Sequence, residues 1–262
     1  MRISLVMPAF NEEATLARVV LRALGVAGVS EIVIVNDGSD DRTGAIADEL
    51  ARAHSAVRVI HQPRNLGKAE ALRTGIAATG GEIVIIQDAD LEYDPRDIPE
   101  LVQPIVDGEA DVVFGSRFLV RRAARVLYFY HYLANKALTF LSNLLTNVNM
   151  TDIHTGYKAF RGEVIRSMRI SGKGFGADTE IAAKVAKLGC AIYEVPISYH
   201  GRTYAEGKKV GAWDGVVALW YILRFNLFCT RKGAYTSLPR LARELQPASG
   251  LATAAARHDQ AG

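Results

Sequence analysis

The chain has 262 residues, of which 49% are apolar and 23% charged, and this mixture excludes a disordered or collagen-like protein. Its 31 Lys and Arg residues against 28 Asp and Glu leave a net charge of only +3, which argues against nucleic-acid binding through a strongly basic surface. Two cysteines are too few for a disulfide framework, and the chain opens on a strand-like segment without a signal peptide. We therefore expect a cytoplasmic protein.

The first 115 residues alternate between short apolar runs and helical patterns. Such alternation predicts a mostly parallel central sheet with helices on both faces, whose ligands bind beyond the carboxyl ends of the strands. The predicted strands are Ile3–Met7, Glu31–Val35, Val57–Ile60, Ile83–Ile86 and Asp111–Phe114. The predicted helices are Glu13–Leu24, Arg42–Ala53, Lys68–Ala78 and Ile98–Val106.

The second half of the chain is less regular. It contains an aromatic stretch at Val126–Leu145, a helix near Thr179–Leu188 and a strand near Ala191–Val195. We expect one domain over residues 1–235, with amphipathic helices at about 119–146 and 212–230, and a flexible tail over 236–262. Neither apolar helix has the roughly 20 uninterrupted apolar residues of a membrane span. Each is either an interfacial helix with basic flanks or a buried core helix.

An acidic segment follows the fourth predicted strand. Asp88, Asp90 and Glu92 alternate along the chain, so an extended backbone would present all three carboxylates on one side. Oxygen ligands of this kind suit Mg²⁺ or Mn²⁺, whereas the plain alternative is a solvated turn, where Asp is common. The position at the end of a buried strand favours the metal site.

A second polar segment, Asn36–Ser39, follows the second predicted strand. Asp37 is suited to accept hydrogen bonds from a ribose hydroxyl or a base, and Gly38 permits a turn with positive φ. The segment also fits a helix cap, with Ser39, Asp40 or Asp41 as the capping residue. Both roles are compatible.

Several enzyme classes are disfavoured by missing motifs. The sequence lacks the glycine-rich signatures of dinucleotide-binding and P-loop proteins, zinc spacing and the nucleophile elbow of α/β-hydrolases. Basic residues nevertheless occur where an anion would need them. Arg117 follows the fifth predicted strand, and Arg202 and Lys208 lie in a glycine-flanked segment. With the carboxylates, they suggest a site for a diphosphate ligand.

Taken as a set, five segments resemble the inverting family 2 glycosyltransferases, and more narrowly the dolichol-phosphate mannose synthases and polyprenyl-phosphate glycosyltransferases. The segments are MPAFNEEATL, IVNDGSDDRT, NLGKAEALRTGI, IIQDADLEYDP and VVFGSRF; GRTYAEGKK and ALWYILRFN support the narrower match. The resemblance covers roughly residues 3 to 228. It implies an α/β GT-A type nucleotide-diphospho-sugar transferase fold, a nucleotide-sugar donor such as GDP-mannose or a UDP-hexose, and a polyprenyl or dolichyl phosphate acceptor.

The resemblance also implies roles for individual residues. The donor would be bound by Pro8, Phe10, Glu12, Val35, Asp37, Asp88, Ala89, Asp90, Arg117, Arg202 and Lys208. Asp88, Asp90 and Glu92 would hold Mg²⁺ or Mn²⁺, with Asp90 the leading ligand, and Asp90, Arg117 and Arg202 would be catalytic. Phe10 stands where Tyr is frequent in the mannose synthases, and Glu92 stands where Gln is usual. The acceptor-side arginine has no clear counterpart; Arg121, Arg122 and Arg125 are the candidates.

A phosphate acceptor is already anionic, so it attacks the anomeric carbon without a strong base and gives inversion. Such an enzyme would lie peripherally on the cytoplasmic face of a membrane. The alternative within the family is a soluble transferase acting on a saccharide or small-molecule hydroxyl, for which Asp178 and Glu180 are candidate bases. Glu180 also fits a helix first-turn carboxylate. A more distant alternative is a haloacid-dehalogenase-like phosphatase, which also places Asp-x-Asp after a strand.

Overall fold

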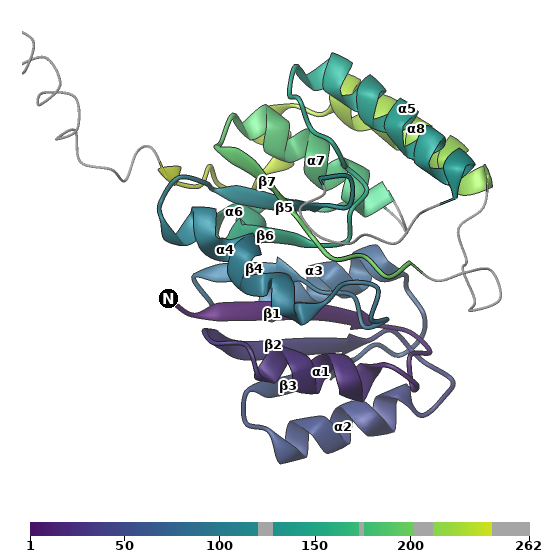
Figure 1. Ribbon diagram of the computed structural model, residues 1–262, viewed down its shortest axis with the longest axis vertical. Helices are drawn as coiled ribbons and strands as arrows, with labels where there is room; N and C mark the ends of the chain where they lie inside the picture. Colours follow the sequence, from purple (N-terminus) through teal and green to yellow (C-terminus); the bar gives the residue numbers. More distant parts are fainter. Residues whose placement is uncertain (120–127, 173–175, 202–211, 243–262) are drawn as a thin grey trace, which may run out of the picture.

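A seven-stranded sheet forms the centre of the molecule (Figure 1). The computed structural model describes residues 1–119, 128–172, 176–201 and 212–242. The strand order is β3-β2-β1-β4-β6-β5-β7, and β6 runs antiparallel to both of its neighbours while the other pairs are parallel. This confirms the predicted mostly parallel sheet.

The elements of the first half agree with the sequence pattern to within a few residues. The strands are β1 (Ile3–Ala9), β2 (Val29–Asn36), β3 (Val57–His61), β4 (Ile83–Ile86) and β5 (Val112–Ser116). The helices are α1 (Leu16–Leu24), α2 (Thr43–Ala53), α3 (Lys68–Ala78), the short 3₁₀ helix η1 (Pro95–Asp97) and α4 (Ile98–Val106). The strand boundaries could be predicted because strands covered on both faces of a sheet form nearly continuous apolar runs.

The second half contains a strand and two short helices that the sequence pattern did not predict. They are β6 (Lys158–Arg161), α6 (Gly162–Ser167) and α9 (Arg231–Ala234). Because the four-residue β6 begins and ends with a basic residue, a search for apolar runs does not find it. The other elements are α5 (Phe129–Thr146), α7 (Gly176–Leu188), β7 (Ile192–Pro196) and α8 (Ala212–Phe228).

The core lies on both faces of the sheet because side chains alternate along each strand. On one face Leu5, Ile32 and Ile85 pack under α1, α2 and α4. On the other face Val6, Ile86 and Phe114 pack with α3, α6 and α7. Central strands such as β4 and β5 are fully buried, so a polar site has room at their ends.

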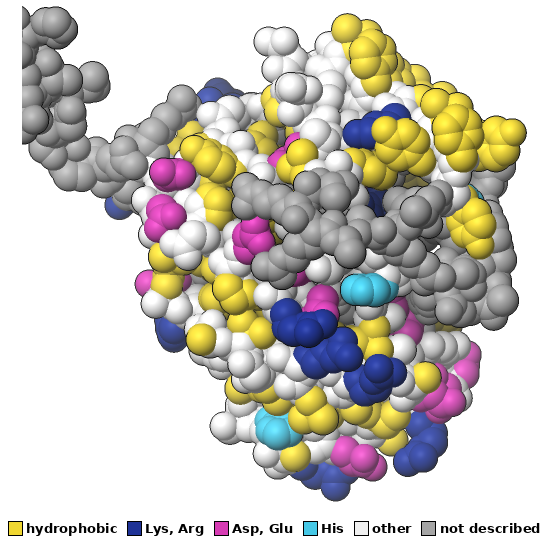
Figure 2. All heavy atoms as spheres, in the orientation of Figure 1, with side chains coloured by type: hydrophobic (Ala, Val, Ile, Leu, Met, Phe, Trp, Pro, Cys, Tyr) yellow, Lys and Arg dark blue, Asp and Glu magenta, His cyan; other side chains and the backbone are white. Residues whose placement is uncertain are grey.

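Helices α5 and α8 lie side by side at one end of the molecule and contact each other (Figure 1). Both carry large apolar side chains that are exposed; Phe129 is 67% exposed and Trp220 58%. Figure 2 shows such hydrophobic side chains gathered at this end. No helix within the described part of the chain has the length and hydrophobicity needed to cross a bilayer.

Candidate active site

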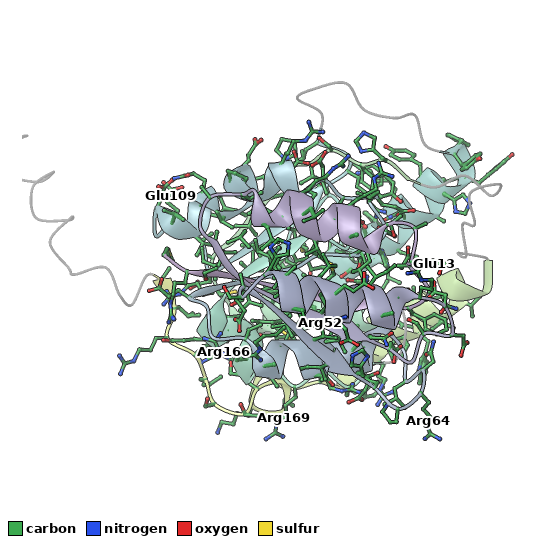
Figure 3. The ribbon with its side chains drawn as sticks, turned by 90° about the horizontal axis from the view of Figure 1, so that it is seen from below. Glu13, Arg52, Arg64, Glu109, Arg166 and Arg169 are labelled. Atoms are coloured by element: carbon green, nitrogen blue, oxygen red, sulfur yellow. The ribbon has the colours of Figure 1, made fainter. Side chains whose placement is uncertain are left out.

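The polar segments after β1, β2, β3 and β4 meet at the carboxyl edge of the sheet, as predicted. The register pairs Pro8 with Val35, and the amide of Asp37 donates to the Ala9 carbonyl at 2.9 Å. Glu13 and Arg64, from the segments after β1 and β3, lie at the same end of the molecule in Figure 3, opposite Glu109 and Arg166. The strand order brings these segments together.

The loops after β1 and β2 are cross-linked by hydrogen bonds. The Asn11 amide donates to Ser39 Oγ at 3.1 Å, and the Glu12 amide donates to Thr43 Oγ1 at 2.8 Å. Asp41 Oδ1 accepts from the Thr43 amide, at the first residue of α2, at 2.9 Å, but the N-cap residue is Arg42, which makes no side-chain capping bond. The predicted pocket residues Phe10 and Glu12 therefore sit on a braced loop, and both are half-buried.

Asp37 is buried and holds the loop that precedes α3. Its two carboxylate oxygens accept from the amides of Leu66 and Gly67, each at 2.8 Å. Gly38 has φ of +66°, and a Cβ there would lie 2.4 Å from the carbonyl carbon of Arg64. The predicted positive φ is confirmed, and it allows the loops after β2 and β3 to pack together.

Val35 and Ala89, which were predicted to bind the nucleotide-sugar donor, have side chains that point into the core. Val35 is 0% exposed and packs against Ala71 of α3, and Ala89 is 2% exposed within the core on the other face. Their side chains are therefore not available to a ligand at the sheet edge.

The acidic segment after β4 is not extended, so the prediction that Asp88, Asp90 and Glu92 point to one side by strand alternation is wrong. β4 ends at Ile86, the chain turns at Ala89–Glu92, and Leu91 has φ of +63°. The Glu92 amide donates to Asp90 Oδ1 at 3.1 Å, and the Glu92 carboxylate accepts from the Tyr199 hydroxyl at 2.9 Å. Among the residues described, no three His, Cys, Asp or Glu side chains form a preassembled metal cluster.

Asp88 instead pairs with Lys68, a residue that the sequence analysis did not assign to the site. Lys68 Nζ lies 2.7 Å from one carboxylate oxygen of Asp88 and 3.0 Å from the other. Burial by itself would lower the pKa of Lys68, but Asp88, with help from Asp178, raises it. Lys68 is the first residue of α3 and directly follows the loop after β3, so the rule that ligands bind after strand ends would have found it.

Asp88 also lies close to the loop that precedes β6. A Cβ on Gly156 would lie 2.4 Å from Asp88 Oδ2 and 2.9 Å from a ring carbon of Tyr93. The Gly156 amide donates to the Tyr93 hydroxyl at 2.8 Å. Glycine at position 156 thus lets this loop close over the acidic segment.

Arg117 is fixed by a buried carboxylate. Its Nε and Nη2 donate to the two oxygens of Asp152 at 2.7 and 2.8 Å, and the Asp152 side chain is 0% exposed. Burial would raise the pKa of Asp152, yet the Arg117 guanidinium outweighs burial and lowers it. Arg117 keeps further N–H groups for an anion, because a guanidinium has five.

Behind the site lies a buried ion pair, Lys158 with Asp178. Lys158 Nζ donates to Asp178 Oδ1 at 2.5 Å and also to the Thr155 carbonyl. Burial favours a raised pKa for Asp178, but the ammonium groups of Lys158 and Lys68 lower it. Burial lowers the pKa of the neighbouring His154 to about 4, although Asp178 and Asp152 act in the opposite direction.

Glu180, the second candidate base, has a structural role. It is 0% exposed, and its carboxylate accepts from the Ser171 amide and hydroxyl, the Gly172 amide and Lys184 Nζ. The prediction of Glu180 as a base is wrong, because four donors already occupy it inside the core. Arg202, Lys208, Arg121, Arg122 and Arg125 lie outside the described residues.

An open α/β sheet with braced loops and a carboxylate–cation cluster at its carboxyl edge is the GT-A arrangement of a glycosyltransferase. The sequence profile described as glycosyl transferase family 2 matches residues 4–169, and the chain belongs to that family. This membership excludes the phosphatase alternative.

Relatives extend the match beyond the profile. The chain is 28% identical over 244 residues to an undecaprenyl-phosphate mannosyltransferase of Micrococcus luteus, covering 87% of this chain and 99% of that protein. It is 30% identical over 218 residues to a polyprenol monophosphomannose synthase of Mycolicibacterium smegmatis, covering 80% and 82%. A dolichol-phosphate mannosyltransferase of Pyrococcus furiosus is 30% identical over 215 residues, covering 80% and 60%.

Solved structures with this fold include glucosyl-3-phosphoglycerate synthase of Mycobacterium tuberculosis. It aligns with a TM-score of 0.64 and 25% identity, covering 86% of this chain and 78% of that one. A second structure of that enzyme, with Mn²⁺, UDP and phosphoglyceric acid, aligns with a TM-score of 0.63, 27% identity and the same coverage.

Proposed function

We propose that this glycosyltransferase moves a hexose from a nucleotide-diphosphate sugar, GDP-mannose or a UDP-hexose, to a polyprenyl or dolichyl phosphate with inversion. The observation that carries the proposal is the match, over most of the chain, to relatives named for polyprenyl or dolichol phosphates. The exposed apolar side chains of α5 and α8, which suit a lipid acceptor, add independent support.

The donor would lie over the carboxyl edge of the sheet, against Pro8, Phe10, Glu12 and Asp37. Asp88 and Asp90 fit a divalent metal such as Mg²⁺ or Mn²⁺, because Mg²⁺ is typically held by one or two carboxylates together with substrate phosphates. Such a metal, when bound, supplies positive charge that stabilises the leaving nucleoside diphosphate. Glu92 as a third ligand stays a prediction.

Basic side chains would neutralise part of the negative charge on the phosphates of the donor. Arg117 is held in place by Asp152, so its orientation costs little entropy when an anion arrives. Arg202 and Lys208 are proposed for the same role from the motif match alone.

A phosphate monoester acceptor needs no general base in this scheme, because its second pKa is about 6 and its oxygen is already anionic. The chain's residues then position the two substrates and stabilise charge. Asp178 agrees with this scheme, since Lys158 and the low pKa of its carboxyl leave it as a structural counterion.

We propose that α5 and α8 place the enzyme on the cytoplasmic face of a membrane. Phe129→Ser and Trp220→Ser should reduce co-sedimentation with anionic liposomes, because both side chains are exposed on these helices. Leu21→Ser is the matched control, since Leu21 is 53% exposed but lies on α1. Equal losses in all three variants, or none, would contradict the membrane assignment.

The enzymatic test is to incubate the purified chain with Mg²⁺ or Mn²⁺, a short polyprenyl phosphate and a panel of GDP- and UDP-sugars. A glycosylated lipid from one donor supports the proposal, and Asp90→Ala should abolish it while leaving thermal unfolding unchanged. Near-normal activity of Asp90→Ala would refute the metal assignment.

A second candidate is transfer to a small soluble acceptor, which the fold likeness to a synthase crystallised with phosphoglyceric acid favours. Adding 3-phosphoglycerate as a possible acceptor in the enzymatic test distinguishes transfer to a lipid phosphate from transfer to a soluble acceptor. Product on 3-phosphoglycerate and none on lipid would select the soluble acceptor.

A further inference from the structure

Two cations from different elements meet at one aromatic ring beside the proposed site. The Arg117 guanidinium carbon lies 5.7 Å from the centroid of the Phe118 ring, and Lys136 Nζ lies 4.5 Å from it. Arg117 and Phe118 follow β5, whereas Lys136 lies on α5. All three residues are partly buried, and the Arg117 side chain is only 12% exposed.

Both cations keep hydrogen-bonding capacity. Asp152 takes two of the five N–H groups of Arg117, and the Tyr199 side chain is a further hydrogen-bond partner. Lys136 donates to the Thr151 carbonyl at 3.2 Å, which uses one of the three donor positions of an ammonium group. A phosphate that binds Lys136 would therefore make charge-assisted hydrogen bonds without displacing an ion pair.

The cation pair borders an apolar surface. The Tyr132 ring contacts the Phe118 ring edge-on at 5.2 Å and lies 5.8 Å from Lys136 Nζ. On the same helix Phe129 is 67% exposed, Tyr130 82% and Leu133 52%. A ligand with an anionic head and an apolar tail matches this combination of two cations and an exposed aromatic helix.

We propose that Lys136, beside the donor-side Arg117, binds the phosphate of the acceptor, a phosphate monoester. The inference rests on the proposed function, and it assigns an acceptor-side cation where the sequence motifs lacked an arginine. Lys136 lies on α5, away from the donor segments after β1, β2 and β4, so its loss should affect acceptor binding and leave donor binding intact.

Binding of the full chain to farnesyl phosphate, to farnesol and to 3-phosphoglycerate, measured by calorimetry without donor, tests the proposal. Lys136→Gln keeps a donor for the Thr151 carbonyl and removes the charge, and Lys136→Arg keeps the charge. Lys232→Ala is the matched control, because Lys232 is exposed on α9. Thermal unfolding of each variant confirms that it is folded.

We expect Lys136→Gln to weaken farnesyl phosphate binding about tenfold or more, because it removes a charge-assisted hydrogen bond to the phosphate. Farnesol binding should not change, and Lys136→Arg and Lys232→Ala should bind like the wild type. In turnover, Lys136→Gln should raise KM for the acceptor and leave KM for the donor within twofold. The proposal is overturned if Lys136→Gln binds farnesyl phosphate within twofold of the wild type, or if the wild type prefers farnesol.

The results distinguish failure of the proposed function from failure of the proposed phosphate site. Lys136-dependent phosphate binding without glycolipid from any donor would refute the proposed function and support the phosphate site. Glycolipid formation with normal kinetics in Lys136→Gln would do the reverse. Lys136-dependent binding of 3-phosphoglycerate that equals that of farnesyl phosphate would assign the site to a soluble phosphate acceptor.

Discussion

Replacing Asp178 by Asn should destabilise the protein strongly, because it leaves the Lys158 ammonium group buried without its counterion. The Lys158 side chain is 0% exposed and that of Asp178 is 7% exposed, so water cannot replace the lost charge. Breaking a buried ion pair costs about 3–5 kcal/mol. Asn keeps a hydrogen-bond acceptor, so we expect the lower end of this range, about 3 kcal/mol.

Urea and thermal unfolding measure this effect. At about 2–4 °C per kcal/mol for a chain of this size, Tm should fall by about 6–12 °C. The double variant Lys158→Met/Asp178→Asn should recover much of the loss, because it removes both charges. Asp48→Asn is the control: its ion pair with His61 is exposed, so Tm should change by less than about 2 °C.

A loss below about 1 kcal/mol in Asp178→Asn, or a double variant no more stable than the single one, would refute the reasoning. Turnover measured at a temperature where the variant is folded distinguishes a loss of stability from the loss of a catalytic group. An Asp178 general base would appear as a loss of about 10²–10⁴-fold, whereas a structural counterion predicts a much smaller effect.

Three further predictions follow from the site. Lys68→Met should bind Mn²⁺ alone several-fold more tightly in a calorimetric titration, because the ammonium on Asp88 competes with the metal; unchanged affinity would contradict this. Gly156→Ala should lower Tm, since its Cβ would lie 2.4 Å from Asp88 Oδ2, whereas Gly215→Ala in α8 meets nothing within 4 Å and should not. The pKa of His154 is about 4 in the folded chain and near 6.5 in the unfolded one, so folding stability should fall by up to about 3 kcal/mol as pH drops from 6.5 to 4. His154→Gln should flatten that part of the stability curve.

The first half of the fold, and the sheet edge at which the polar segments gather, were predictable from local pattern. Apolar runs such as Ile83–Ile86 end at the sheet edge, and the polar residues that follow them, including Asp37 and Asp88, therefore meet there. The strand β6 was not predictable in this way, because its first residue, Lys158, is basic yet completely buried. Its burial depends on the ion pair with Asp178, 20 residues later, and on the Thr155 carbonyl, which also accepts from its ammonium group.

The amino-acid sequence by itself determined the family, the parallel sheet and the set of carboxylates and cations at its edge, because these depend on residue type and short-range spacing. Tertiary structure decided which charges pair: Lys68 with Asp88, Arg117 with Asp152 and Lys158 with Asp178. It also gave Asp178 and Glu180 different partners, Lys158 for Asp178 and the Gly172 amide among others for Glu180. It placed Lys136 of α5 against Phe118. The physical reason is that ionic and aromatic contacts act over a few ångströms in space between residues far apart in the chain, so only the packed fold determines them.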